Sequence, residues 1–561
     1  MKALCSFLLR GRAALLWSVA ASSSAVLLLA SSDAPDPEAP EPPAPLFEGL
    51  GSWQHPVETQ HALAQRYFNQ GLMFIYGFNH KEAIRAFEAS AKLDPELAMA
   101  WWGVAFAHGP NINAPMAGDA VPPAWTALQN ALRLKTQASP RHQAYIDALA
   151  TRYASEPKPD RAALDATYAE AMRRVTEMYP DDLDAAVLYA DAVMNTMAWD
   201  YWLADRRTAK PATLEIMRKI EDVLARRPDH PGANHAYIHL VEAGPEPFRA
   251  LPSADRLQFY APDAGHLVHM PSHIYIRTGR YHEATLANER AAAADRAYIA
   301  QCQAQGFYPG MYYPHNLHFI WYALSFEGRA DECIRAAMQV ADYATSPLCG
   351  TDVAEAPRLR HLPWLAQARF GRWDELLALA EPPEDRPLDR AMWHYVRTLA
   401  FAAKNDADAA ARESVALDKI VADGAIKPLD NPYLPASSIV QVAQHVAAAR
   451  VSGARGDHEA MITALRSAVE AEHALPYMEP AFWYYPTRQS LGAALLKLGR
   501  AEEAAKVFRE DLLEFPRNGW SLYGLTAAMQ AQGRPDDAAL LQREFAAAWP
   551  HADRAPDLSW F

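Results

Sequence analysis

The segment SHIYIRTGRYHEA, residues 272–284, decides the fold prediction. In it a small residue and an aromatic residue three positions later precede the pattern Gly-x-Tyr-x-Glu-Ala. From Ala62 onward, apolar residues recur at helical spacing almost without interruption, with neither alternating strand patterns nor a glycine-rich phosphate loop. Related spacing is clearest near the C-terminus, at Leu491, Gly492, Leu495, Gly499, Ala504, Phe508 and Pro516. These patterns predict an all-α fold.

The same patterns resemble the tetratricopeptide repeat (TPR), a helix pair of about 34 residues. In the register of that repeat, Gly279 takes position 15, Gly71 and Gly492 take position 8, and Phe87 and Phe508 take position 24. The resemblance covers most of the chain from about residue 60 to about residue 550. It implies a TPR-like, right-handed superhelical solenoid of antiparallel helix pairs, in which each repeat packs mainly on its neighbours.

Histidines are concentrated in one part of this array. Eight of the 20 lie between Pro231 and Tyr322, and most fall at spacings of three, four or seven residues, which share one helical face. The TPR register places these residues on the first helices of three successive repeats, which line the concave groove in TPR arrays. The sets are His235, His239 and Glu242; His266, His269 and His273; and His315 and His318.

These sets predict a metal site. Neutral imidazole is the commonest protein metal ligand, and adding Glu242 gives the two-His-one-carboxylate combination of zinc and non-haem iron sites. We therefore expect transition metal (copper, zinc or iron) bound by these eight residues, as one ion or two, with Glu242 as ligand or general base. The chemistry would be oxidation or hydrolysis, and the sequence leaves open whether the protein is an enzyme. In the alternative, these histidines form a polar core hydrogen-bonded to Asn234, Ser272 or Asn316.

A second function stays open, a non-catalytic scaffold that binds a protein or peptide in the groove. TPRs that clamp a carboxylate use Lys, Asn and Arg at groove positions where this chain has histidine, so that kind of clamp is not expected. The net charge of −14 argues against a nucleic-acid partner.

Two segments outside the histidine sets attract attention. Residues 304–314 (AQGFYPGMYYP) look like an insertion between repeats, either an aromatic loop that closes over the histidines or an ordinary long connection. Residues 479–488 cluster four aromatics, for which we expect packing between repeats, with ligand stacking as the alternative.

The N-terminus is typical of an exported protein. A basic start and an apolar run end at a small-residue cleavage site, so residues 1–32 are predicted to be a signal peptide or an uncleaved N-terminal anchor, the one expected membrane contact. A linker rich in proline and acidic residues follows at 33–58. TPR-like repeats are expected at 59–230, the His-rich repeats at 231–345 and further repeats at 346–561. The segment HMPSHIY (269–275) resembles one found in large bacterial exported TPR proteins, which implies a periplasmic or membrane-anchored protein facing the periplasm.

The four cysteines do not indicate a fold built on disulfides. Cys5 lies in the predicted signal, so the other three allow at most one bridge, for which Cys302 and Cys349 are candidates. Cys333 occupies a position where a TPR packs a small residue, and we expect it to be buried.

Overall fold

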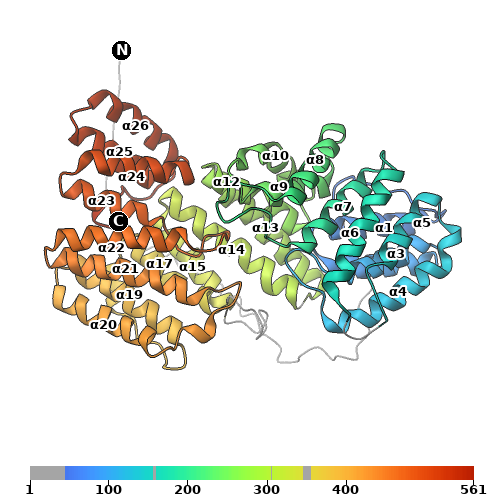
Figure 1. The fold of residues 1–561 in the computed structure, drawn as a ribbon, viewed down its shortest axis with the longest axis horizontal. Helices are drawn as coiled ribbons and strands as arrows, with labels where there is room; N and C mark the ends of the chain where they lie inside the picture. Colours follow the sequence, from blue (N-terminus) through green and yellow to red (C-terminus); the bar gives the residue numbers. More distant parts are fainter. Residues whose placement is uncertain (1–43, 156–158, 305, 345–355, 561) are drawn as a thin grey trace, which may run out of the picture. The chain divides into compact units, whose positions relative to one another are not determined.

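The computed structural model describes residues 44–155, 159–304, 306–344 and 356–560 of the 561-residue chain. The part from Pro43 to Phe561 forms one compact unit. Its described residues are mainly helical, and the extended pairings found among them are isolated bridges such as Asn111–Ala114. The predicted all-α solenoid of antiparallel helix pairs is confirmed (Figure 1).

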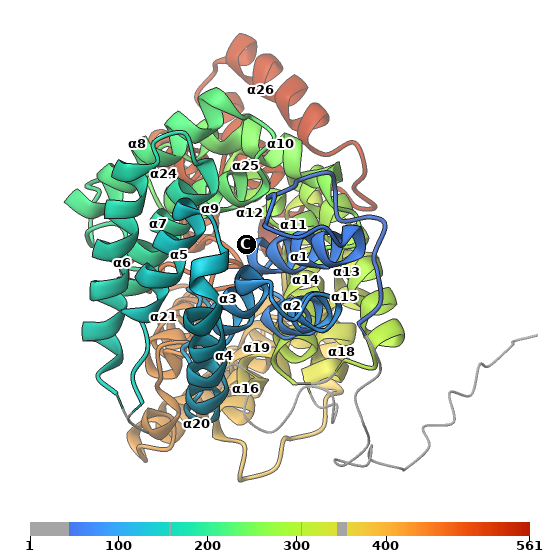
Figure 2. The same ribbon diagram turned by 90° about the vertical axis from the view of Figure 1, so that its right-hand side faces the viewer.

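The N-terminal helices lead from the described start of the chain to the His-rich repeats, and they stand in front in Figure 2. They are α1 (Ala62–Tyr76), α2 (His80–Leu93), α3 (Ala98–Ala107), α4 (Val121–Leu134), α5 (Pro140–Ala150), α6 (Arg161–Met178), α7 (Leu183–Thr196) and α8 (Pro211–Arg226).

The central helices carry the predicted histidine sets. They are α9 (Pro231–Val241), α10 (Leu251–Tyr260), α11 (Gly265–His269), α12 (Pro271–Arg277), α13 (Tyr281–Cys302), α14 (Phe307–Glu327) and α15 (Ala330–Ala344). Two of the turns between them use a glycine with positive φ, Gly279 at 75° and Gly328 at 73°. Glycine adopts this left-handed conformation without the steric cost of a Cβ atom.

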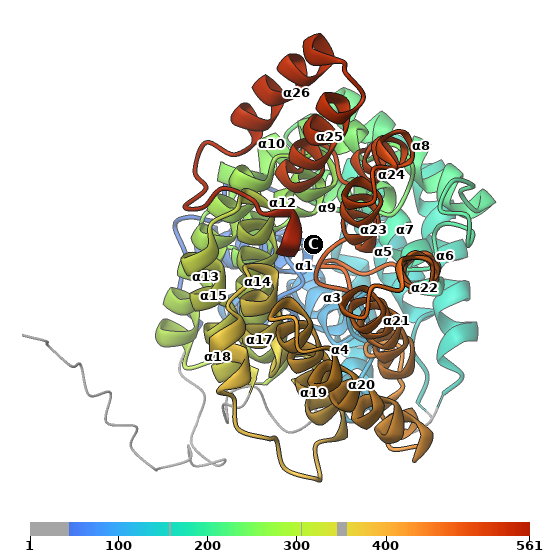
Figure 3. The same cartoon turned by 90° about the vertical axis from the view of Figure 1, so that its left-hand side faces the viewer.

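The C-terminal helices stand in front in Figure 3. They are α16 (Ala356–Leu359), α17 (Leu362–Arg369), α18 (Trp373–Leu377), α19 (Pro387–Ala403), α20 (Ala407–Ala422), α21 (Ala436–Ala454), α22 (His458–His473), α23 (Thr487–Lys497), α24 (Ala501–Glu514), α25 (Gly519–Ala531) and α26 (Pro535–Ala548). Across the described residues, none of the helices combines the length and the apolar composition needed to cross a membrane.

Phenylalanine at position 24 of the repeat packs against glycines of the two neighbouring helices. A Cβ atom on Gly71 of α1 would lie 2.7 Å from the ring of Phe87 on α2, and one on Gly103 of α3 would lie still closer to the same ring. Since carbon atoms at van der Waals contact are about 3.5–4.0 Å apart, only glycine leaves room for the ring. This packing is what the predicted TPR register requires.

The same arrangement recurs near the C-terminus. Phe508 of α24 lies between Gly492 of α23, whose Cβ would come within 2.7 Å of the ring, and Gly524 of α25, whose Cβ would come closer still. The repeat therefore uses one mechanism at both ends of the solenoid to seat an aromatic ring between three helices.

The C-terminal helices also contact the central ones directly. Trp520 on α25 donates its indole N–H to the Ser325 carbonyl of α14 at 2.8 Å, and Trp549 donates to the Phe326 carbonyl at 2.7 Å. The Asp553 carboxylate accepts the backbone N–H of Ala330, at the start of α15, at 3.0 Å. These bonds join residues that are about 200 positions apart in the sequence.

Part of the predicted linker packs against the helices. The backbone N–H of Phe47 donates to Gln70 of α1 at 3.0 Å, that of Gly49 donates to Asp263 at 2.8 Å, and Leu50 is buried. These hydrogen bonds and the buried Leu50 hold the non-helical residues 44–58 on the solenoid. The predicted signal and the linker up to residue 43 lie outside the described residues, and the division of the repeats at residues 230 and 345 stays a prediction.

The prediction of an inserted loop at 304–314 is wrong. Helix α14 begins at Phe307 and contains Pro314, so most of that segment forms the first turns of a 21-residue helix. Helix α13 before it has 22 residues. Two long helices therefore account for the extra length between Gly279 and Gly328.

The cysteines agree with the prediction as far as they are described. Cys302 and Cys333 are buried, and neither forms a disulfide within the described part of the chain. Cys333 is fully buried, which confirms its expected place as a small packed residue. Cys349, and with it the Cys302–Cys349 pairing, lies outside the described residues.

We predict that Gly524→Ala destabilises the protein. The new methyl group would overlap the Phe508 ring, and overpacking of this kind costs about 1–3 kcal/mol, which exceeds the gain of up to about 1 kcal/mol from alanine's helix propensity. Urea unfolding measures the change. Gly118→Ala is the control, because nothing lies within 4 Å of a Cβ there. Equal stability of the two variants would contradict the packing argument.

Candidate metal centre

All eight predicted residues lie on, or at the end of, helices of neighbouring repeats. His235 and His239 lie one turn apart on α9, and Glu242 caps its C-terminal end. Helices α11, α12 and α14 carry the others, which are His266 and His269, His273, and His315 and His318 respectively. A break at Met270–Pro271 separates α11 from α12.

The structure brings seven of these eight residues together and adds Glu479. Three sets each offer one ligand atom per residue, with the atoms within 4.8 Å of one another: His235, His239 and His266; His269, His273 and His315; and Glu242, His273 and Glu479. We refer to these six histidines and two glutamates as the histidine cluster. Imidazole rings of neighbouring repeats approach closely, with the His235 and His266 ring centroids 4.9 Å apart.

The cluster is almost fully removed from water. Its histidines are at most 3 % exposed, apart from the half-buried His315, and Glu242 is 0 % exposed. Burying polar groups without hydrogen-bond partners costs free energy, so each ring nitrogen in this space needs a partner.

Hydrogen bonds fix the tautomers of His235 and His239. His235 Nδ1 lies 2.6 Å from the Tyr76 carbonyl oxygen, which can only accept, so Nδ1 carries the proton. His239 Nδ1 likewise donates to Glu242 Oε1 at 2.8 Å. The Nε2 atoms of both rings therefore hold lone pairs, and within the described residues these atoms have no hydrogen-bond partner. Metal-binding histidines are oriented in this way, through an acceptor on the other nitrogen.

His266 completes this first set. Both of its ring nitrogens are buried and without a hydrogen-bond partner among the described residues. Burial and the adjacent His235 hold its pKa well below the usual value, and burial and His239 do the same for the pKa of His235. Both rings are therefore neutral, which is the form that binds metal ions.

His269 and His273 face each other through their Nε2 atoms, 2.8 Å apart. His269 Nδ1 donates to Asn288 Oδ1 at 2.6 Å, while His273 Nδ1 lies 2.6 Å from Glu242 and 2.9 Å from Glu479. Two lone pairs cannot meet at 2.8 Å, so a proton or another cation must lie between the Nε2 atoms. Burial lowers the pKa of His273, but the two carboxylates outweigh it and raise that pKa to about 10.

Glu242 contacts imidazoles with both of its oxygens, Oε1 with His239 and Oε2 with His273. Burial would raise the pKa of Glu242, but His273 and His239 lower it to about 2, so the carboxylate is ionised. Burial instead raises the pKa of Glu479 to about 7, even though His273 opposes this. Glu242 thus accepts a ring N–H from His239, and both carboxylates form ion pairs with His273.

Glu479 was not predicted from the sequence. It lies in the connection between α22 and α23 and reaches His273 from repeats far along the chain. No spacing rule relates it to the histidines, and the aromatic residues of 479–488 were the feature that stood out. Tyr477 donates a short hydrogen bond to it.

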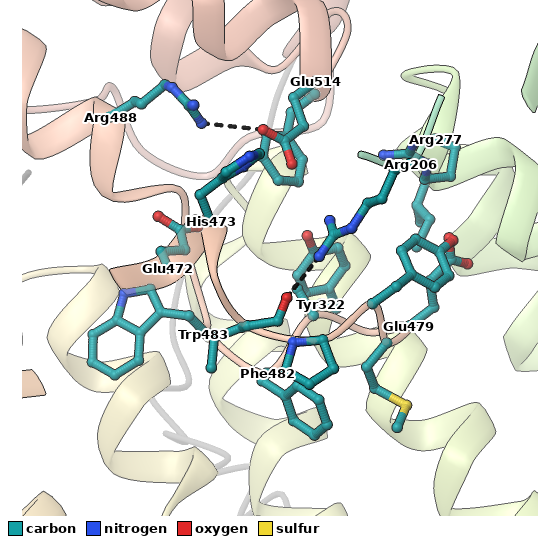
Figure 4. Close-up of a pocket in the computed structure, with 17 residues that line it drawn as sticks. Arg206, Arg277, Tyr322, Glu472, His473, Glu479, Phe482, Trp483, Arg488 and Glu514 are labelled. Atoms are coloured by element: carbon teal, nitrogen blue, oxygen red, sulfur yellow. Dashed lines mark hydrogen bonds and ion pairs between the residues drawn. The ribbon is translucent and has the colours of Figure 1, made fainter. Parts of the chain in front are cut away.

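A pocket of about 70 Å³ lies beside Glu479. Figure 4 shows Arg206, Arg277, Tyr322 and Glu479 around it, with Phe482 and Trp483 at one side. Arg206 donates to the Leu475 carbonyl at 2.7 Å, and Arg277 donates to the Glu242 carbonyl at 3.1 Å. Glu479 is the member of the cluster that lines this pocket, and Arg277 links the pocket to the Glu242 backbone.

His318 lies apart from the cluster. Its ring stacks on Trp321, with centroids 5.2 Å apart, and it lines a different pocket together with Arg358 and His361. Although its spacing puts it on the same helix as His315, the structure places it in none of the three sets. Tyr312, from the segment expected to be a loop, packs on the cluster instead, with its ring centroid 4.5 Å from that of His266.

A buried network behind the cluster holds α11, α13 and α14 together. Asp295 accepts hydrogen bonds from Tyr308 at 3.1 Å and from Asn316 at 2.7 Å, and the Tyr308 hydroxyl accepts the backbone N–H of His266 at 3.2 Å. Burial raises the pKa of Asp295 to about 7. Gly265 lies so close that an added Cβ would overlap this carboxyl group.

A second histidine–carboxylate network was missed by sequence reasoning. His55 Nδ1 lies 2.7 Å from Asp184, His142 Nδ1 lies 2.8 Å from Glu58, and the two Nε2 atoms are 3.0 Å apart. Trp53 donates to Asp184 at 3.0 Å. These residues come from three distant stretches with no shared period. The network ties residues 53–58 to the solenoid.

Comparisons with known proteins add little. No model of a known protein family matches the chain, and a search of curated proteins finds no match. Among solved structures, the chain is similar to the human IFIT1 dimer with m7Gppp-AAAA at 11 % identity and a TM-score of 0.30, covering 88 % of this chain and 91 % of that one. The yeast Tom70 structure is 12 % identical to this chain, with a TM-score of 0.28, and the match covers 86 % of this chain and 89 % of that one. At such scores nothing about function follows, and the TPR-like fold is inferred from the chain's own helix pairs.

We predict that Asp295→Asn removes a pH-dependent loss of stability. In the folded protein Asp295 stays protonated up to about pH 7, whereas in the unfolded chain it ionises near its ordinary pKa of about 3.9. The wild type is therefore expected to lose roughly 2–4 kcal/mol relative to the variant as pH rises between these values. The substitution keeps both hydrogen bonds of this side chain, because the asparagine oxygen can accept from Asn316 and its NH2 group can donate to the Tyr308 hydroxyl. Urea unfolding at several pH values tests this, and a constant difference between the two proteins would contradict it.

Asp184→Asn is expected to destabilise the second network. Removing one charge from buried histidine–carboxylate contacts costs about 3–5 kcal/mol when the partner is left uncompensated. Urea unfolding at neutral pH measures the loss. Asp181→Asn is the matched control, since that side chain is 94 % exposed. If both variants unfold at the same urea concentration, the network does not hold residues 53–58 in place.

Proposed function

We propose that this chain binds a transition-metal ion through the buried imidazoles of the histidine cluster, with the TPR-like solenoid as the scaffold that positions them. The observation that carries the proposal is the set of unpartnered ring nitrogens. Nε2 of His235, Nε2 of His239 and both nitrogens of His266 are buried, have no hydrogen-bond partner among the described residues and belong to one set of neighbouring ligand residues. A metal ion would supply the partner that the buried lone pairs lack.

The alternative of an ordinary polar core is less well supported. Asn234 donates to the carbonyls of Pro228 and His230, and Asn316 donates to Asp295. Ser272 donates to the His269 carbonyl. Ser272 also lies 3.4 Å from Nδ1 of His269, a nitrogen that Asn288 already satisfies. None of the three side chains therefore reaches the unpartnered nitrogens of His235, His239 or His266.

The donor set suits copper, zinc or iron, because neutral imidazole binds all three. A zinc ion would supply Lewis-acid chemistry for hydrolysis, and copper or iron would supply redox chemistry. Both oxygens of Glu242 contact histidines, so in this proposal it orients ligands and does not act as general base. Glu479 lines the pocket and is the better placed carboxylate for exchanging a proton with a small molecule there.

Two further parts of the proposal rest on the sequence. Residues 1–32, as a signal peptide or anchor, would direct the protein to the periplasm, where the ion would be acquired. The repeats would then present their remaining surfaces to a protein or peptide partner. That scaffold function stands alone if the cluster binds no metal.

Elemental analysis of the purified protein tests the proposal. We expect at least one equivalent of a transition metal in wild type, made without a histidine tag, and loss of most of it in a His235→Ala/His269→Ala/His273→Ala variant. Ligand binding at about 100 times its dissociation constant stabilises a protein by about 2.7 kcal/mol, so thermal unfolding should shift upward with metal only in wild type.

His458→Ala is the control, because that imidazole is exposed at the start of α22. It should retain the wild-type metal content. If neither wild type nor the control holds metal after reconstitution with zinc, copper and iron, the metal-binding function is wrong and the protein is a scaffold.

A further inference from the structure

We propose that the histidine cluster holds two metal ions, one in each of two separate triads of imidazoles that share a single orienting carboxylate, Glu242. This inference rests on the proposed metal binding. It adds how many ions bind, which residues bind each ion and what charge the ions carry. The first triad is His235, His239 and His266, and the second is His269, His273 and His315.

The two triads have no residue in common. Within each, the three ligand atoms lie within 4.8 Å of one another, so small side-chain movements would bring them onto one ion. Each triad contains one close pair of rings, His235 with His239 and His269 with His273, both 4.8 Å apart between centroids. Ring centroids do not divide the two sets, because His239 lies 6.4 Å from His266 of its own triad and 5.7 Å from His273 of the other. The division therefore rests on the ligand atoms.

Each triad has its own partner for orientation. In the first, the Tyr76 carbonyl fixes His235 with Nε2 free to bind. In the second, the Asn288 side chain does the same for His269, because its own N–H donates to the Ala284 carbonyl and leaves its oxygen facing the ring. Acceptors of this kind raise metal affinity by holding the ring in its binding orientation.

Glu242 connects the triads. Its Oε1 accepts the Nδ1 proton of His239 in the first triad, and its Oε2 lies 2.6 Å from Nδ1 of His273 in the second. It therefore acts as a positioning residue for both ions without occupying a ligand position itself. Asn or Gln at this position would offer one acceptor oxygen where two are needed.

Charge indicates the class of ion. Within the described part of the chain, the carboxylates that contact these imidazoles are Glu242 and Glu479, which supply at most two negative charges. Two monovalent copper ions balance these charges in a buried space, whereas two divalent ions would leave an excess that must be met by anions from solution. Imidazole is a suitable copper ligand.

The test is anaerobic titration of the metal-free, full-length protein with Cu(I) in competition with a copper chelator. Wild type is expected to bind two equivalents. His235→Ala/His266→Ala and His269→Ala/His315→Ala should each bind one, and His458→Ala should bind two. If circular dichroism shows that a pair does not fold, the single variants His266→Gln and His315→Gln replace it, and each should weaken one of the two binding events.

Each result decides a different point. One equivalent in wild type overturns the two-ion inference and leaves the proposed function standing. Loss of both ions from either pair of substitutions overturns the separation into triads. No binding of Cu(I), Zn(II) or Fe(II) by wild type overturns the proposed function as well. Two equivalents of Zn(II) without any Cu(I) would keep the triads and overturn the charge argument.

Glu242→Gln tests the shared carboxylate. Loss of an orienting acceptor lowers metal affinity by about 10- to 100-fold, and here both ions should be weakened together while two equivalents still bind at high copper concentration. Glu242→Asp, which keeps two acceptor oxygens, should recover part of the affinity at both triads. An affinity loss at one triad alone, or none, would overturn the shared role.

Discussion

Several buried imidazoles in the centre of this protein donate a ring N–H to an acceptor on another helix, and these hydrogen bonds hold the repeats in place. Tyr76 at the end of α1 accepts from His235 of α9, and Asn288 of α13 accepts from His269 of α11. Glu242 accepts from His239 through Oε1, and its Oε2 lies 2.6 Å from Nδ1 of His273 in the next repeat. Apolar packing alone would tolerate small shifts between helices, but hydrogen bonds of 2.6–2.8 Å do not.

The regular and the irregular parts of the solenoid make different contributions to the centre. Regular repeat positions place histidines of adjacent first helices side by side. An irregular feature supplies the remainder, because the connection before α23 brings in Glu479. Long helices α13 and α14 then cover the site, with Tyr312 against His266.

The sequence predicted the fold well because its signals are local. Helical periodicity, turn glycines such as Gly279 and the glycine–phenylalanine spacing of Gly492 and Phe508 all act within one repeat. The histidine sets were recognised for the same reason, since helical spacing defines a face. Glu479 and the network of His55 with Asp184 could not be found this way, because tertiary contacts alone unite them. His318 shows a different limit of sequence reasoning. Helical spacing correctly places it on α14 with His315, but its side chain packs on Trp321 and does not join the histidine cluster.

The hydrogen bonds from the indoles of Trp520 and Trp549 to carbonyls of α14 affect how this chain folds and unfolds. Simple repeat arrays behave as one-dimensional chains, in which end repeats fray independently and contacts stay local. Here the last repeats close a loop of about 200 residues onto the middle of the array, which raises the contact order and slows folding. The terminal repeats are therefore part of the same cooperative unit as the histidine-bearing helices, and trimming them would expose backbone carbonyls next to the centre.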